Sequence, residues 1–258
     1  AGKPLILSQY LGVINLMNNK IGIGIAGLGT VGEGFLKQLK KYKTGNKKTS
    51  NFELINIAVK NLRKKRNVAT KNLPLIKDTL SLASNPKIDI VIELIGGSSG
   101  VTYKLVKKSL MNGKSIITAN KALLAIHGNE LIKIAEKNNC FISFEAAIAG
   151  GIPVVKAIRE NLKFNEITKV YGILNGTCNY ILTKMETEGK DFNSVLKDAQ
   201  NLGFAELDPS FDIKGIDAAH KITLLSSLAF NVPVNFSSTY IEGIQNIEID
   251  DFNLVREF

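Results

Sequence analysis

The sequence has no tryptophan, two histidines and two cysteines among its 258 residues. Cys140 and Cys178 lie far apart, and no CxxC or paired His/Cys spacing accompanies them, so neither a zinc site nor a disulfide framework is indicated. We therefore expect a protein of the reducing cytoplasm. Runs of low charge are broken by charges or glycines well short of the ~20 apolar residues that span a bilayer, which predicts no membrane segment.

Acidic residues are scarce beside basic ones, and the formal net charge is +10. The basic excess is concentrated at residues 37–48 and 63–66. Nucleic-acid binding is one interpretation of such an excess, and a solvated lysine-rich surface is the other. We expect the solvated surface and no nucleic-acid partner.

The length and the hydrophobic content of 45% suit one large domain or two of moderate size. Residues 1–16 carry an apolar stretch without a convincing cleavage site, and Met17, followed by Asn-Asn-Lys, resembles a natural start. We expect residues 1–16 to be a non-native or upstream extension that takes no part in the fold.

From residue 17 to residue 150 the chain alternates β-rich runs with helical patterns. Strands are predicted at 21–26, 52–60, 88–94, 115–119 and 141–146, with helices at 31–42, 105–113 and 128–139. This alternation is typical of an α/β fold with a Rossmann-type doubly wound parallel sheet. We therefore predict a dinucleotide-binding domain at 17–150.

The pattern changes near residue 150. A helix at about 152–162 and a strand at 166–174 are predicted, followed by helices that begin near Thr177, Asp191 and Asp212. We expect residues 151–258 to form an α+β substrate domain.

Three glycines, Gly27, Gly29 and Gly32, form a GxGxxG pattern between the first predicted strand and a helix. The first permits a tight turn, the second lets the backbone approach a pyrophosphate, and the third allows close helix-to-strand packing. The helix N-terminus then offers N–H donors to the phosphates. The alternative is a glycine-rich turn in a sheet that binds nothing.

No acid follows the second predicted strand, where NAD-selective sites place one to bind the ribose 2′-hydroxyl. Lys60 and Asn61 stand there instead, and residues 63–66 are all basic. This favours NADP as the cofactor, with NAD as the alternative, and Lys60 has the most suitable position. The basic side chains can also point into solvent.

The stretch at 203–221 gathers acids in an otherwise basic chain. If Asp212 caps a helix, one face carries a single acid and a single base among apolar residues, namely Ile213, Asp217, Lys221, Leu224 and Leu228. The pair is either an internal ion pair that ties the helix to the sheet, or a general acid held by its aspartate. In the second interpretation Glu206 holds a polar group of the substrate.

Six motifs then carry a resemblance to one family. GLGTVGEG (27–34), ELIGG (93–97), TANKALLA (118–125), FEAAIAGGIPVV (144–155), GILNGTCNYIL (172–182) and AQNLGFAELDPSFDIKGIDAAHK (199–221) resemble homoserine dehydrogenase, in the family's order. The resemblance implies reversible NAD(P)H-dependent reduction of L-aspartate 4-semialdehyde to L-homoserine, on the route to threonine and methionine. The substrate is thus a small molecule, and the full-length enzyme is expected to be a homodimer.

The resemblance also assigns roles to residues. It makes Lys221 the proton donor, with Asp217, Gly203 and Glu206 at the substrate, and it puts Lys121 at the cofactor and reacting centre. It assigns further dinucleotide contacts to Leu28, Thr30, Val31, Gly97 and Ser98, and a monovalent cation such as Na⁺, held mainly by backbone carbonyls, to Glu145, Ile148, Gly150 and Ile152. From the residues alone, AGGIP (149–153) is equally a turn before a helix, and Cys178 a packing residue at a helix entry rather than a nucleophile.

The sequence departs from the family at two places. The family commonly has Arg-Asp where Lys60 and Asn61 stand, which leaves the cofactor preference open. The family also continues beyond the position of Phe258, so we expect an incomplete substrate domain and a fragment whose own activity is in doubt. Another aldehyde- or amino-acid-directed dehydrogenase, or a non-catalytic binding protein, remains an alternative.

Overall fold

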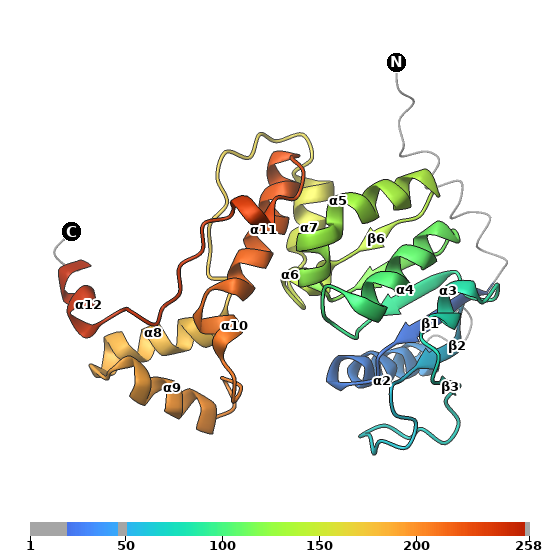
Figure 1. Cartoon of the computed structure of the whole chain (residues 1–258), viewed down its shortest axis with the longest axis horizontal. Helices are drawn as coiled ribbons and strands as arrows, with labels where there is room; N and C mark the ends of the chain where they lie inside the picture. Colours follow the sequence, from blue (N-terminus) through green and yellow to red (C-terminus); the bar gives the residue numbers. More distant parts are fainter. Residues whose placement is uncertain (1–19, 46–50, 256–258) are drawn as a thin grey trace. The chain divides into compact units, whose positions relative to one another are not determined.

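The computed structural model describes residues 20–45 and 51–255 (Figure 1). The expected extension at 1–16 and part of the basic stretch at 37–48 lie outside these residues. The chain divides into two compact units, which we call unit 1, ending at Ile152, and unit 2, beginning at Pro153. Each unit is described by itself. No described helix is both long enough and apolar enough to cross a membrane.

Within the described residues of unit 1, six parallel strands form one sheet in the order β3-β2-β1-β4-β5-β6 (Figure 1). The strands are β1 (Ile21–Ala26), β2 (Phe52–Ala58), β3 (Leu75–Ile76), β4 (Ile90–Glu93), β5 (Ser115–Thr118) and β6 (Ile142–Ser143). The predicted doubly wound parallel sheet is confirmed. The predicted strand at 141–146 is too long, because a short helix begins at Glu145.

The helices of unit 1 follow the strands along the chain. They are α2 (Thr30–Gly45), α3 (Ser81–Ser84), α4 (Gly100–Met111), α5 (Lys121–Lys137) and α6 (Glu145–Ile148). The chain moves outward in one direction from β1 to β3 and in the other from β4 to β6. Because parallel crossovers are right-handed, helices of the two halves cover opposite faces of the sheet. The order therefore reverses between β1 and β4, where doubly wound sheets bind their ligands.

The core of unit 1 lies on the central strands. Ile25 and Ile57 are fully buried, and Leu28 and Leu36 pack in the same cluster. The predicted strands near β1, β2 and β4 read as almost continuous apolar runs because both faces of such a sheet are covered. This rigid centre positions the loops at the carboxyl ends of β1, β4 and β5.

Unit 2 is helical in its described residues. It contains α7 (Val154–Lys156), the π-helix η2 (Ala157–Asn161), α8 (Gly176–Glu188), α9 (Phe192–Asn201), α10 (Ser210–Ile213), α11 (Ile216–Phe230), the 3₁₀ helix η3 (Phe236–Ser238) and α12 (Ile249–Val255). Ile181 and Met185 of α8 pack with Val195 and Ala199 of α9 in its core. The predicted helix start near Asp191 is confirmed, since α9 begins at Phe192 and the Asp191 carboxylate caps it by accepting a hydrogen bond from Ser194 N.

Two predictions for unit 2 are wrong. Residues 166–174 form no strand, because no described segment pairs with their backbone, and Tyr171 and Ile173 are 84% and 77% exposed. Asp212 does not cap the long helix either. Gly215, with φ of +77°, separates α10 from α11, so the long helix begins at Ile216.

Candidate functional site

The glycine loop follows β1 and leads into α2. Gly27 has φ of +99°, and a Cβ there would lie 2.6 Å from the carbonyl oxygen of Leu94, so no other residue fits without strain. A Cβ on Gly29 would meet no atom within 4 Å. The backbone at Gly29 is thus open, as a close approach by a pyrophosphate requires, and the first N–H groups of α2 follow directly.

The remaining loop residues differ in what they can offer a ligand. Leu28 is buried in the core, so only its backbone can face a ligand, and its carbonyl oxygen accepts a hydrogen bond of 3.3 Å from Arg66 Nε. Thr30 and Val31 are exposed. Arg66 also donates to the carbonyl of Asn61 over 2.8 Å. A guanidinium from the basic stretch therefore lies beside the glycine loop, a contact that the sequence did not reveal.

A cleft of about 170 Å³ lies in unit 1 at the carboxyl ends of β4 and β5, beside α2. It is lined by Val31, Glu93, Leu94, Ile95, Gly96, Ala119 and Asn120. Through Val31, which follows β1, and Glu93, which ends β4, the cleft adjoins the point between β1 and β4 where the strand order reverses, and there an open α/β sheet binds a dinucleotide. The open Gly29 backbone, the start of α2 and this cleft together fit a bound dinucleotide.

The other residues expected at the cofactor lie at the ends of neighbouring elements. Gly97 and Ser98 belong to the loop between β4 and α4, and Lys121 is the first residue of α5, directly after Asn120 of the cleft. Lys60 is exposed just beyond the end of β2. In described residues, therefore, all of these positions lie at the carboxyl ends of strands of one sheet.

The acid and the base expected on one helix form an ion pair in unit 2. Lys221 Nζ lies 2.8 Å from Asp217 Oδ2, and the two side chains are 18% and 7% exposed. Lys221 Nζ also donates to the carbonyl oxygen of Leu174 over 2.7 Å. A charge pair this far removed from water is costly unless its remaining hydrogen bonds are made. The ammonium is thus fixed by two oxygens from different segments.

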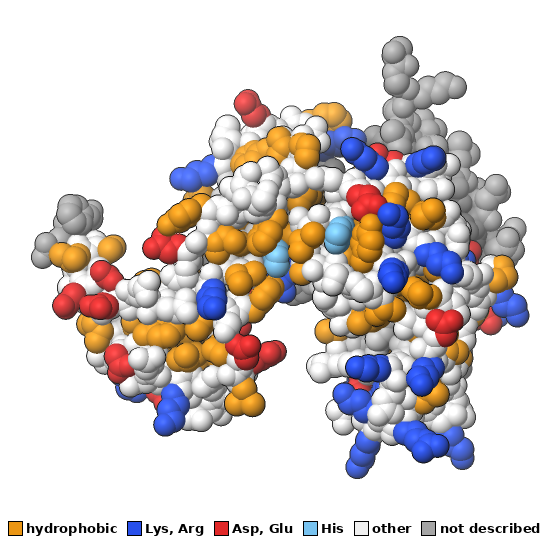
Figure 2. Space-filling model, in the orientation of Figure 1, with side chains coloured by type: hydrophobic (Ala, Val, Ile, Leu, Met, Phe, Trp, Pro, Cys, Tyr) orange, Lys and Arg blue, Asp and Glu red, His pale blue; other side chains and the backbone are white. Residues whose placement is uncertain are grey.

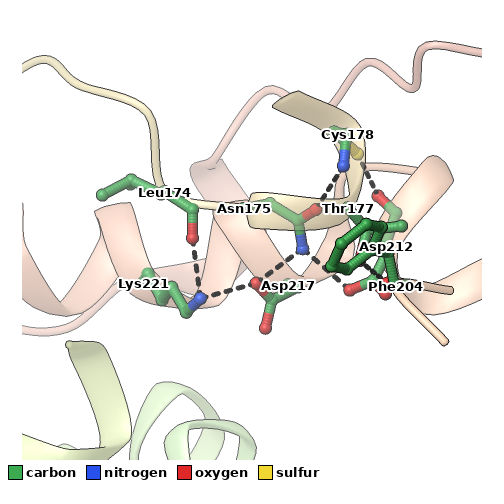
Figure 3. A network of polar contacts seen from close by, with 8 residues as sticks. All are labelled: Leu174, Asn175, Thr177, Cys178, Phe204, Asp212, Asp217 and Lys221. Carbon is green, nitrogen blue, oxygen red and sulfur yellow. Dashed lines mark hydrogen bonds and ion pairs between the residues drawn. The ribbon is translucent and has the colours of Figure 1, made fainter. Parts of the chain in front are cut away.

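Asn175 joins this pair to a second aspartate (Figure 3). Its Nδ2 donates to Asp217 Oδ2 over 3.0 Å and to Asp212 Oδ1 over 2.7 Å. Its Oδ1 accepts from Cys178 N over 2.8 Å, so Asn175, and not Thr177, is the cap of α8. One amide therefore fixes a helix end and two carboxylates, and no local sequence pattern indicated this role.

Cys178 faces the same carboxylates. Its Sγ donates to the carbonyl of Asp212 over 3.3 Å. Burial, with the negative charges of Asp212 and Asp217, raises the pKa of the thiol to about 11. The thiol is thus protonated at neutral pH, and a nucleophilic thiolate is disfavoured, in agreement with the packing role expected for this cysteine.

Gly203 and Glu206 lie on the loop between α9 and α10, and both are exposed. Gly203 has φ of +77°, and the carbonyl of Glu206 accepts a hydrogen bond from Gln200 Nε2 over 3.1 Å. The Glu206 carboxylate takes no part in the Asn175 network of Figure 3. The structure therefore brings Asp217 and Lys221 together and leaves Glu206 available to solvent.

A larger hollow of about 350 Å³ in unit 2 is lined by Val170, Tyr171, Gly172, Leu174, Gly215, Ala218, Ala219, Ile222, Tyr240, Ile241 and Glu242. It lies along a face of α11 that lacks the side chains of Asp217 and Lys221. Leu174 lines this hollow and also contacts the ion pair, because its carbonyl oxygen accepts a hydrogen bond from Lys221 Nζ. Size alone would select this hollow, yet neither Asp217 nor Lys221 lines it, and Glu242 is the charged residue of its lining.

The positions expected to hold a cation lie at the end of unit 1. Glu145 and Ile148 belong to α6, Gly150 lies in the following turn, and Ile152 is 64% exposed. The carbonyl of Glu145 already accepts from Ala149 N over 3.1 Å. In the described residues, no group of three or more His, Cys, Asp or Glu side chains is arranged to hold a metal ion.

The basic side chains form no continuous stripe on the face that Figure 2 shows. On unit 1, Lys and Arg side chains are scattered there among hydrophobic and uncharged ones, with fewer acidic side chains between them. A solvated lysine-rich surface without a nucleic-acid partner therefore stays a prediction.

Two family models match the chain in succession. The first, described as the NAD binding domain of homoserine dehydrogenase, matches residues 27–145, and the second, described as homoserine dehydrogenase, matches residues 153–258. The first match lies within unit 1, from the glycine loop to Glu145, and the second spans the whole of unit 2.

Individual proteins that resemble the chain are homoserine dehydrogenases too. The chain is 46% identical to a homoserine dehydrogenase of Pseudomonas aeruginosa over 90% of its own length and 54% of the relative's. A homoserine dehydrogenase structure from Thiobacillus denitrificans has a TM-score of 0.85 and 45% identity over 92% of this chain and 55% of that one. A hyperthermophilic archaeal homoserine dehydrogenase in complex with NADPH has a TM-score of 0.72 and 27% identity over 89% and 75%. The chain thus spans about half the length of the curated relatives it matches.

Proposed function

The chain belongs to the homoserine dehydrogenase family, and from that premise we propose that it carries the dinucleotide domain and the proton donor of an enzyme that reduces L-aspartate 4-semialdehyde to L-homoserine. The reaction is reversible and lies on the route to threonine and methionine. The observation that carries the proposal is the ion pair of Asp217 and Lys221, held in place by Leu174 and Asn175.

Reduction of an aldehyde needs a hydride at carbon and a proton at oxygen. A reduced nicotinamide held by unit 1 would supply the hydride. Lys221 gives an Nζ proton to the oxygen of the aldehyde as negative charge develops there, and takes it back in the reverse direction. Asp217 keeps the ammonium charged and aims it, and Asn175 in turn holds the Asp217 carboxylate. Gly203 and Glu206, on the exposed loop, bind the substrate's amino-acid end.

Unit 1 is proposed to bind NADP in preference to NAD. Arg66 lies at the carbonyl of Leu28, Lys60 is exposed just beyond β2, and no acid occupies the position that would bind a ribose 2′-hydroxyl. The residues that hold the pyrophosphate are Gly27, Gly29 and Gly32, with Thr30 and Val31 at the start of α2. Gly97, Ser98 and Lys121 contact the nicotinamide half.

Three further features remain proposals of the same kind. They are a homodimer, a cytoplasmic location, and a monovalent cation at Glu145, Ile148, Gly150 and Ile152. Sedimentation of the purified full-length protein tests the homodimer, and a single monomeric species would contradict it. Titration with Na⁺ followed by calorimetry tests the cation, and the absence of a binding signal would contradict that site.

The test of the activity is a product assay with the natural full-length protein. We expect one L-homoserine to form for each NADPH oxidised in the presence of L-aspartate 4-semialdehyde, and a lower kcat/KM with NADH. The matched control is L-glutamate 5-semialdehyde, which has one more methylene between its amino-acid end and its aldehyde. Equal turnover of both aldehydes, or NADPH oxidation without L-homoserine, would favour another dehydrogenase of similar fold.

A further inference from the structure

A buried carboxylate lies at the floor of the cleft in unit 1. Glu93, the last residue of β4, is fully buried. Its Oε1 accepts from Ile95 N over 2.8 Å and from Gly96 N over 3.0 Å. A fully buried glutamate side chain is rare unless its hydrogen bonds are made, and here both of its oxygens have partners.

The second oxygen of Glu93 connects the turn after β4 to the neighbouring strand. Thr118, the last residue of β5, pairs in register with Glu93, and its hydroxyl donates to Glu93 Oε2 over 2.6 Å. The same hydroxyl oxygen accepts from Asn120 N over 2.9 Å. The hydroxyl is thus used both as a donor and as an acceptor, and Thr118 is 1% exposed.

Asn120 closes the ring of contacts. Its Nδ2 donates to the carbonyl of Gly97 over 2.7 Å, and its Oδ1 accepts from Leu123 N as the cap of α5. The ring therefore runs from Glu93 through Thr118 and Asn120 to Gly97 and back along the turn. It joins the loop after β4 to the first turn of α5, where Lys121 lies.

The turn that the ring holds is conformationally unusual. Gly96 and Gly97 have φ of +84° and +79°, and a Cβ on either would meet no atom within 4 Å. Close packing at the Cβ positions is thus not what calls for glycine here. The backbone of the turn is held by hydrogen bonds: Ile95 N and Gly96 N donate to Glu93, Gly97 O accepts from Asn120, and Gly96 O accepts from Thr102 Oγ1 over 2.9 Å.

Resting on the proposed function, we propose that Glu93, Thr118 and Asn120 are positioning residues that preset this turn and the start of α5 for the nicotinamide half of the dinucleotide. The adenosine half belongs to the β2 side of the reversal point, so the β4 and β5 side receives the nicotinamide half. Glu93 acts through the backbone of Ile95 and Gly96. A preset turn avoids the ordering cost of binding, so the ring contributes to affinity.

The test separates the two halves of the cofactor. Binding of NADPH and of adenosine 2′,5′-bisphosphate, which has only the adenosine half, is measured by calorimetry for the wild type, Thr118→Val, Thr118→Ser and Glu93→Gln. Thr118→Val and Glu93→Gln each disturb a charge-assisted hydrogen bond, so NADPH affinity should fall roughly 10-fold to 100-fold. Affinity for the bisphosphate should stay within about twofold of wild type in every variant. Thr118→Ser keeps the hydroxyl and should bind NADPH as wild type does.

Controls keep structural effects apart from positioning. Ser109→Ala removes another buried hydroxyl of unit 1, one that has no hydrogen-bond partner among described residues, and should change neither affinity. Thermal unfolding of each variant reports folding. Unchanged NADPH affinity in Thr118→Val and Glu93→Gln, or equal losses of affinity for both ligands, would overturn the positioning role and leave the proposed cofactor standing. A folded wild type that binds neither ligand would overturn the proposed cofactor as well.

Discussion

Replacement of Asn175 by alanine should destabilise unit 2 far more than the loss of an ordinary helix cap. The change removes the cap of α8, which is worth about 1 kcal/mol. It also removes two hydrogen bonds to carboxylates, each worth about 1.5 to 3 kcal/mol. Because Asp217 keeps Lys221 as a partner, the lower end applies, and we expect a total loss of about 3 to 5 kcal/mol.

Two companion variants separate these contributions. Asp191→Ala deletes the cap of α9, an exposed carboxylate bonded to Ser194, and should lower the free energy of unfolding far less than Asn175→Ala does. Asn175→Asp keeps a capping oxygen but turns the donor into a third carboxylate beside Asp212 and Asp217, so most of the loss should remain. Urea unfolding followed by circular dichroism gives the free energies of unfolding. If Asn175→Ala costs no more than Asp191→Ala, the network contributes nothing beyond the cap.

Three further predictions concern single residues. Gly27→Ala should lower the stability of unit 1 by about 2 kcal/mol or more in thermal unfolding, whereas Gly29→Ala should leave stability nearly unchanged and weaken NADPH binding; equal stabilities would contradict the strain at Gly27. Because folding raises the pKa of the Cys178 thiol from 9.0 to about 11, the protonated thiol makes its full contribution to the free energy of unfolding below pH 9 and loses it as pH rises towards 11. Between these pH values wild type should lose stability relative to Cys178→Ala, and equal pH dependence of unfolding in the two proteins would refute this. Lys114, whose pKa burial lowers, donates to the carbonyls of Asn85 and Ile88, so Lys114→Met should cost about 2 kcal/mol in urea unfolding; a neutral effect would contradict it.

The sheet of unit 1 could be predicted because its signal is local and repeated. Apolar runs such as residues 21–26 alternate with helical patterns, and parallel strands follow from that alternation. The ion pair of Asp217 and Lys221 was also predictable, since i,i+4 residues share one helix face. Strand β3 was missed, because it has only two residues, Leu75–Ile76, and pairs with β2 alone.

Other features depend on contacts that no local pattern records. Asn175 meets Asp217 across 42 positions of sequence, and Arg66 meets Leu28 across 38. The break at Gly215 was missed because the acid at Asp212 looked like a helix cap, whereas its carboxylate binds Asn175. For residues 166–174, β-branched composition favoured a strand, but a strand also needs a neighbour to pair with.

The central claim is that Lys221 gives the proton that completes reduction of the aldehyde. The most direct measurement compares kcat for L-aspartate 4-semialdehyde and the affinity for NADPH in Lys221→Met, with exposed Lys214→Met as the matched control, in the natural full-length protein. We predict a fall in kcat of roughly 10² to 10⁴ for Lys221→Met with NADPH affinity and fold unchanged, and no effect for Lys214→Met. A kcat within a few-fold of wild type in folded Lys221→Met would contradict the claim.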